Sequence, residues 1–80
     1  MKLPRDMDAP ELIRALERIG YRVARQSGSH VRLETETPER HALTIPRHSP
    51  LKIGTLAAIL GEVAAHRQIS KAQLLDMLRL

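Results

Sequence analysis

The segment 26–32, Gln-Ser-Gly-Ser-His-Val-Arg, constrains the fold more than any other part of this chain. Its centre is typical of a tight turn, because Gly28 reaches a positive φ without steric cost and serine also favours turns. The residues on either side alternate between apolar and polar side chains. This pattern predicts two strands, residues 21–26 and 30–35, that are joined by a short loop into a β-hairpin.

Side chains on a strand alternate between its two faces, so the hairpin separates apolar from polar groups. Val31 and Leu33 are predicted to face a core, together with Tyr21 and Val23 of the first strand. His30, Arg32 and Glu34 are predicted to face away from it.

A helix is predicted before the hairpin. Asp8 is a candidate N-cap, Pro10 suits the first turn, and Glu11 stands three residues after the cap, as in a capping box. Gly20 occupies the position where a left-handed residue ends many helices. The apolar residues in between recur at helical spacing and form one stripe: Leu12, Ile13, Leu16 and Ile19.

The remaining elements follow the hairpin. Residues 41–45 alternate as a third strand, which Pro46 should end because proline cannot continue a ladder. A second helix is predicted from about Gly54, and Ser70 with Gln73 forms a capping box for a short last helix. The sequence therefore predicts an α+β fold of α-β-β-β-α order, with a three-stranded antiparallel sheet, helices on one face and a short C-terminal helix.

Length and composition limit the alternatives. Eighty residues predict a single domain, 1–80, because a chain this short does not build two cores. Tyr21 is its one aromatic residue, so the core should be aliphatic. The scarcity of aromatic side chains also argues against RNA binding through bases stacked on aromatic rings. The chain has no cysteine, which excludes disulfides and thiolate metal sites.

The sequence also bears on location. The first residues lack the apolar run of a signal peptide, and the longest apolar run, near residues 53–61, is too short to span a bilayer. We therefore expect a cytoplasmic protein that does not contact the membrane.

The basic charge is concentrated in the middle of the chain. The net charge is +4, and residues 21–52 hold six basic and three acidic side chains, a net charge of +3. This excess falls on the hairpin and the loop after the third strand, where it would attract the phosphates of a nucleic acid.

His30 is the residue most suited to chemistry. An imidazole titrates near neutral pH and can act as a general acid or base, although a histidine at a turn is also a common surface residue. The hydroxyls of Ser27 and Ser29 and the guanidinium groups of Arg25 and Arg32 are close in sequence and could bind a phosphate.

Other catalytic sites fit the sequence poorly. No serine stands in a Gly-x-Ser-x-Gly elbow, which argues against a serine hydrolase. His30, His41 and His48 do not have the spacing of metal ligands.

Two further features could bind nucleic acid. Lys52 precedes a helix N-terminus whose free amides could bind a phosphate, but it could equally be a solvated lysine beside an ordinary cap. The last two helices, with residues 65–70 between them, allow a helix-turn-helix reading, although the final helix has few side chains suited to base edges.

Five blocks of the sequence resemble the HicA-type toxins, also called the YcfA-like family. They are residues 2–5, residues 12–21, Gly28-Ser29-His30, Ile45-Pro46-Arg47-His48 and residues 51–60. The chain departs from the family pattern at residues 61–68, which is longer than the usual link between the last two helices, and in the lack of an aromatic residue in the last helix.

The resemblance implies a fold like that of double-stranded-RNA-binding domains, and an endoribonuclease that cleaves mRNA and arrests growth. It also implies a HicB-type antitoxin as partner, and it carries the catalytic histidine onto His30. No metal or cofactor is expected, because RNA supplies its own nucleophile in the 2′-hydroxyl; His48 is the one candidate for a general acid. The predicted RNA contacts are Arg22, Arg25, Ser27, Gly28, Ser29, Arg32 and Lys52.

Two rival functions remain compatible with the sequence. A non-catalytic RNA-binding module would have the same shape and charge. A small DNA-binding regulator would use the C-terminal helices.

Overall fold

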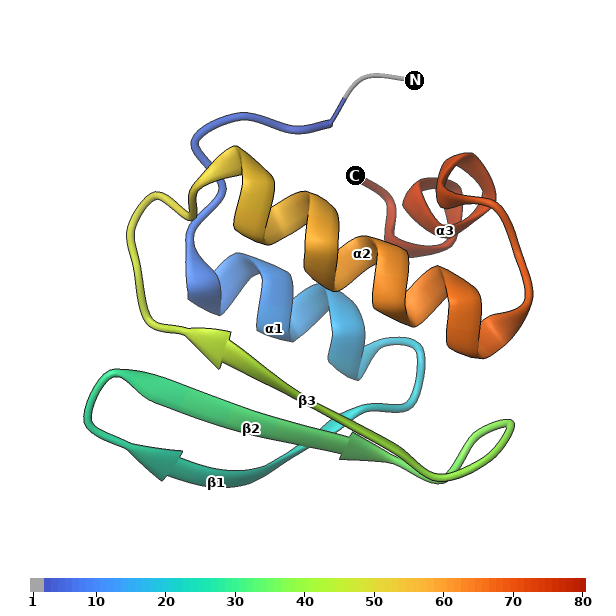
Figure 1. The fold of residues 1–80 in the computed structure, drawn as a ribbon, viewed down its shortest axis with the longest axis horizontal. Helices are drawn as coiled ribbons and strands as arrows, with labels where there is room; N and C mark the ends of the chain where they lie inside the picture. Colours follow the sequence, from blue (N-terminus) through green and yellow to red (C-terminus); the bar gives the residue numbers. More distant parts are fainter. Residues whose placement is uncertain (1–2) are drawn as a thin grey trace.

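Three antiparallel strands form an open sheet in the order β1-β2-β3, with β1 at Arg22–Ser27, β2 at His30–Thr35 and β3 at His41–Pro46. The computed structural model describes residues 3–80, so Met1 and Lys2 lie outside the described residues. Helices α1 and α2 lie on the same side of the sheet, and α3 packs beside the C-terminal half of α2 (Figure 1). The predicted α+β fold and its element order are confirmed.

The first helix, α1, spans Ala9–Glu17 and begins with the predicted capping box. The Glu11 backbone amide donates to the Asp8 carboxylate at 2.9 Å, and the Asp8 amide donates to the Glu11 carboxylate at 3.4 Å. The helix ends before Ile19, because Ile19 and Gly20 donate to carbonyls three residues back and tighten the last turn. Gly20 has a φ of 110°, as its predicted place after the helix requires.

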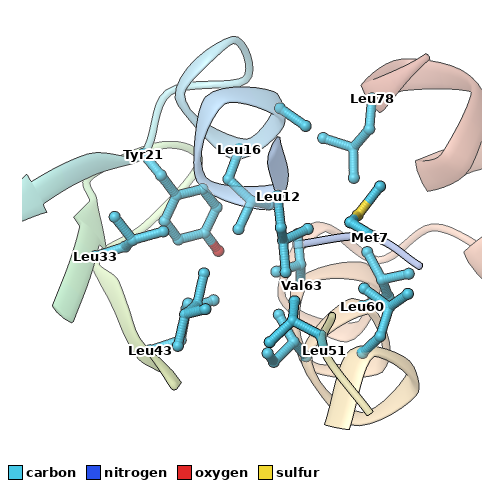
Figure 2. Packing of buried hydrophobic residues seen from close by; sticks show 14 of the residues in the cluster. Met7, Leu12, Leu16, Tyr21, Leu33, Leu43, Leu51, Leu60, Val63 and Leu78 are labelled. Atoms are coloured by element: carbon cyan, nitrogen blue, oxygen red, sulfur yellow. The ribbon is translucent and has the colours of Figure 1, made fainter. Parts of the chain in front are cut away.

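The core lies between the sheet and the helices and is aliphatic, as predicted (Figure 2). Tyr21 is buried beside the leucines, with 3% of its surface exposed. The largest fully buried apolar side chains come from both layers: Leu12, Leu16, Leu33, Ile45, Leu56, Leu60, Val63, Leu74 and Leu78. Because the helices cover only one face of the sheet, the other face is open to solvent (Figure 1).

The second helix, α2, spans Ile53–Arg67, one residue earlier than predicted at its start. It ends at Gln68 in a left-handed conformation, with a φ of 58°. Residues 61–68 are therefore the second half of α2 and its cap, and the expectation of a long link there was wrong. Gly61 leaves room for the Lys71 side chain, which a Cβ would meet at 3.3 Å.

The last helix, α3, spans Lys71–Leu78 and begins with the predicted capping box. The Gln73 amide donates to the Ser70 hydroxyl at 3.0 Å, and the Ser70 amide donates to the Gln73 side chain at 2.9 Å. Within residues 3–80, no helix has both the length and the apolar character needed to cross a membrane.

Candidate functional site

A two-residue turn places His30 at the open end of the hairpin. Ser27 and His30 are paired across β1 and β2, so Gly28 and Ser29 alone form the loop. Gly28 has a φ of 46°, and Ser29 is not among the residues with positive φ. A positive φ at the first central residue alone fits a type II′ turn, in which glycine is preferred at that position. The predicted hairpin is confirmed.

A β-bulge in β1 decides which side chains accompany His30. Val23 pairs with Leu33, but the next pair joins Arg25 to Arg32, so Ala24 is an extra residue in β1. Without the bulge, strict alternation from the inward-facing Val23 would turn Arg25 toward the core. With it, Arg25 lies on the outer face of the sheet, directly opposite Arg32.

The outer face of the sheet is organised in three rows of cross-strand neighbours. Side chains within such a row are about 4.5–5.5 Å apart at Cβ. Successive rows lie two residues apart along β2 and β3, whereas the bulge in β1 separates Arg22 from Arg25 by three residues. The rows are Ser27–His30–Pro46, then Arg25–Arg32–Thr44, then Arg22–Glu34–Ala42. His30 is therefore one row away from two arginines.

Two of the three arginines on this face form ion pairs with glutamates, and within residues 3–80 the third does not. Arg32 Nε lies 3.1 Å from Glu34 Oε2, and this hydrogen bond lowers the pKa of Glu34. Arg22 lies 3.8 Å from Glu34 and 3.9 Å from Glu36. Within the described part of the chain, Arg25 forms no ion pair. Since like charges directly opposite each other destabilise a sheet, a bound anion between Arg25 and Arg32 would relieve their repulsion.

The His30 ring points to solvent and has one engaged nitrogen. Its Nδ1 lies 3.1 Å from the Ser29 hydroxyl, which leaves Nε2 available to a ligand. Arg47, which was not predicted as a site residue, stabilises the turn through two hydrogen bonds. Its backbone amide donates to the Ser29 carbonyl at 2.7 Å, and its guanidinium donates to the Gly28 carbonyl at 3.4 Å.

The structure does not bring every predicted residue to the hairpin. Lys52 is the N-cap of α2, on the helical side of the sheet (Figure 1). His41 pairs with Thr35, at the other end of β2 from His30. Among residues 3–80, no three histidine, cysteine or acidic side chains are grouped so as to hold a metal ion.

The C-terminal helices give little support to a DNA-reading surface. The Gln73 side chain is engaged in the α3 capping box. Leu74, Leu75 and Leu78 of α3 are buried in the core, so this helix serves packing.

Comparison with known proteins settles the family. A family model described as the HicA toxin of bacterial toxin–antitoxin systems matches residues 9–79 of the 80-residue chain. The chain belongs to the HicA toxin family. No match was found among curated proteins or among solved structures. The matched range of this HicA family member includes all three helices and all three strands.

This HicA family member has a second group of titratable side chains, at the end of the sheet away from His30. The Tyr21 hydroxyl lies 2.7 Å from His41 Nδ1, and His41 Nε2 lies 3.7 Å from the Glu62 carboxylate. The His66 ring stacks on His41 with centroids 4.5 Å apart. His66 Nε2 lies 2.8 Å from the Glu39 carbonyl, to which it donates. The group connects the start of β3 to the end of α2.

This group predicts a loss of stability in mild acid. Burial lowers the pKa of His41, and the neighbouring His66 lowers it further, while Glu62 opposes them weakly. The unfolded chain, with a histidine pKa of about 6.5, therefore takes up a proton more readily than the folded chain. The stability present above that pH should fall as the pH drops below it, and it should level off below the pKa of folded His41.

Urea unfolding across a series of pH values measures this effect. We expect His41→Asn to flatten the pH dependence of the unfolding free energy. His48→Asn should leave the dependence unchanged, because His48 is exposed and lies outside this group. Equal pH dependence in the parent chain and in His41→Asn would contradict the assignment.

Proposed function

We propose that this chain is the toxin of a HicA/HicB pair and a metal-independent endoribonuclease that cleaves mRNA in the cytoplasm, with residues 1–80 acting as one domain. The observation that carries the proposal is the position of His30. Its solvent-facing ring lies at the open end of the hairpin, one row from the directly opposed Arg25 and Arg32. A proton acceptor beside two cations, of which Arg25 has no ion pair among the described residues, suits a phosphodiester substrate.

The proposed reaction uses the 2′-hydroxyl of RNA as nucleophile. His30 Nε2 takes the hydroxyl proton while Nδ1–H donates to the Ser29 hydroxyl, and the 2′-oxygen attacks the adjacent phosphorus. The bond from phosphorus to the 5′-oxygen breaks, and that oxygen takes up a proton from water or from His48, the candidate general acid. The products are a 2′,3′-cyclic phosphate and a 5′-hydroxyl. Arg25 and Arg32 stabilise the charge that develops on the phosphate oxygens.

The other predicted RNA contacts have secondary places in this proposal. Ser27 lies beside His30 in the first row, and Gly28 lets the turn keep its conformation. Arg22, in the third row, and Lys52, at the start of α2, would contact RNA that flanks the cut.

The open face of the sheet also supports the partner proposal. The family pairs a toxin with an antitoxin. A HicB-type antitoxin that covers the outer face would block His30 and both arginines at once.

Cleavage of end-labelled RNA in the presence of EDTA tests the proposed reaction. We expect new ends that carry 2′,3′-cyclic phosphates, at a rate that does not depend on added Mg²⁺, because no step needs a metal ion. Treatment with a phosphatase that opens cyclic phosphates should convert these ends.

Two results would contradict the proposal. RNA that is bound but stays intact would show a non-catalytic RNA-binding module. Cleavage that stops in EDTA would show that a metal ion is required.

A further inference from the structure

A hollow lies between α1 and the hairpin, on the side of the sheet opposite His30. Its volume is about 210 Å³. Apolar side chains lining it include Ile13 of α1, Val23 of β1 and Val31 of β2. Pockets that bind drug-sized ligands measure about 300–1,000 Å³, so this hollow suits one smaller group.

The polar lining of the hollow is basic. Its polar lining residues are Arg14 of α1, Arg47 and Gln26 of β1. No acidic residue lines it, whereas Glu62 and Glu39 line two other pockets among the described residues. The charge of the hollow therefore complements an anionic ligand with a small apolar part.

The bulge and the turn connect this hollow to the candidate active site. Because Ala24 is an extra residue in β1, Gln26 pairs with Val31 and belongs to the inner face. The next residue, Ser27, pairs with His30 on the outer face. Arg47 lines the hollow and also donates to the Gly28 carbonyl in the turn.

A nucleotide has the chemistry that this lining requires. An amide both donates and accepts hydrogen bonds, so Gln26 can pair with the edge of a base. Guanidinium groups bind phosphates and stack on the faces of bases. Tyr21, the one residue of the chain that is Phe, Tyr or Trp, is buried and does not offer a stacking surface.

We propose that this hollow binds one base of the RNA substrate, from a nucleotide adjoining the one attacked at His30, and that it biases where the RNA is cut. The RNA strand would bend around the turn of the hairpin, next to Arg47, which bonds to the carbonyls of that turn. This inference rests on the proposed RNA substrate, and it assigns Gln26 and Arg14 as residues that determine specificity.

Binding and cutting are measured separately in the test. Binding is measured by fluorescence anisotropy with short 2′-fluoro RNAs of each base, which lack the nucleophile and stay intact. We expect Gln26→Ala and Arg14→Gln to weaken binding about 3- to 10-fold, as the loss of one or two hydrogen bonds would. The Gln26→Ala loss should be largest for one base. Arg79→Gln at the C-cap of α3, which removes the same charge far from the hairpin, should have a smaller effect.

Cutting is measured by sequencing the ends formed from an RNA of randomised sequence. We expect Gln26→Ala to flatten the base preference at one position beside the cut, and to raise KM while kcat stays within about 3-fold of the parent value. Thermal unfolding confirms that each variant is folded.

The outcomes separate this inference from the proposed function. If the variants bind and cut RNA as the parent does, the inference is overturned and the hollow does not bind a base. The proposed RNA cleavage is unaffected by that result. If the parent chain does not cut RNA but the variants show the base-dependent loss of binding, the hollow is supported and the proposed nuclease is overturned.

Discussion

His30→Ala should reduce RNA cleavage by about 10²- to 10⁴-fold, the contribution of a well-placed acid or base. The substitution removes the imidazole from the first row of the outer face, whose other members are Ser27 and Pro46. It leaves Arg25 and Arg32 in place, so we expect RNA affinity to change little. Single-turnover cleavage rates at saturating protein isolate the chemical step from binding.

The fold should not be affected by this substitution. His30 is exposed, and its side chain bonds only to the neighbouring Ser29 hydroxyl. Exposed positions of this kind change the unfolding free energy by about 0.5 kcal/mol or less. A folded His30→Ala chain that cuts RNA at the parent rate would end the proposal.

His48→Ala is the matched comparison for that experiment. His48 is also exposed and lies two residues after Pro46, the β3 partner of His30. A comparable loss of rate would assign His48 as the general acid. An unchanged rate would exclude it from the reaction.

Leu60→Ala should have the largest effect on stability, a loss of about 2–5 kcal/mol. Leu60 of α2 is fully buried among the aliphatic side chains of the core (Figure 2). Natural proteins of 80 residues have unfolding free energies of roughly 4–12 kcal/mol, so the loss would be a large share of the total. Urea unfolding at pH 7 measures it as a lower midpoint at an unchanged slope.

Ile53→Ala is the control for the core substitution. Ile53 has the same number of side-chain carbons and lies on the same helix, but 48% of its surface is exposed. We expect its unfolding free energy to stay within about 0.5 kcal/mol of the parent value. Equal midpoint shifts in the two variants would contradict the assignment of the core.

Local sequence signals predicted much of this fold. The capping boxes at Asp8 and Ser70 and the turn at Gly28 were all found where their sequences placed them. Each depends on side chains within a few residues of one another, so a short segment contains the whole signal. The outward position of His30 followed from strand alternation in the same way.

Features that depend on distant contacts were not predicted. Whether a strand contains a bulge is decided by its partner, so the sequence of β1 alone did not indicate the extra residue at Ala24. The anchoring of the turn by Arg47 joins residues nearly twenty positions apart, and the stacking of His66 on His41 joins β3 to α2. Lys52 was predicted to precede a helix, and it is the N-cap of α2, but the sequence did not indicate that this helix lies on the side of the sheet opposite the outer face.

The bulge has a consequence for comparing toxins of this family. Loss of Ala24 alone would leave every pair of the β1–β2 ladder in place, and Val23 and Arg25 would keep their faces, because Ala24 is the extra residue of the bulge. If Ala24 were kept but the bulge were lost, Ala24 would stand opposite Arg32, and strand alternation would turn Arg25 toward the core. The length of β1, as much as its composition, therefore has to be aligned before conservation at these positions is interpreted.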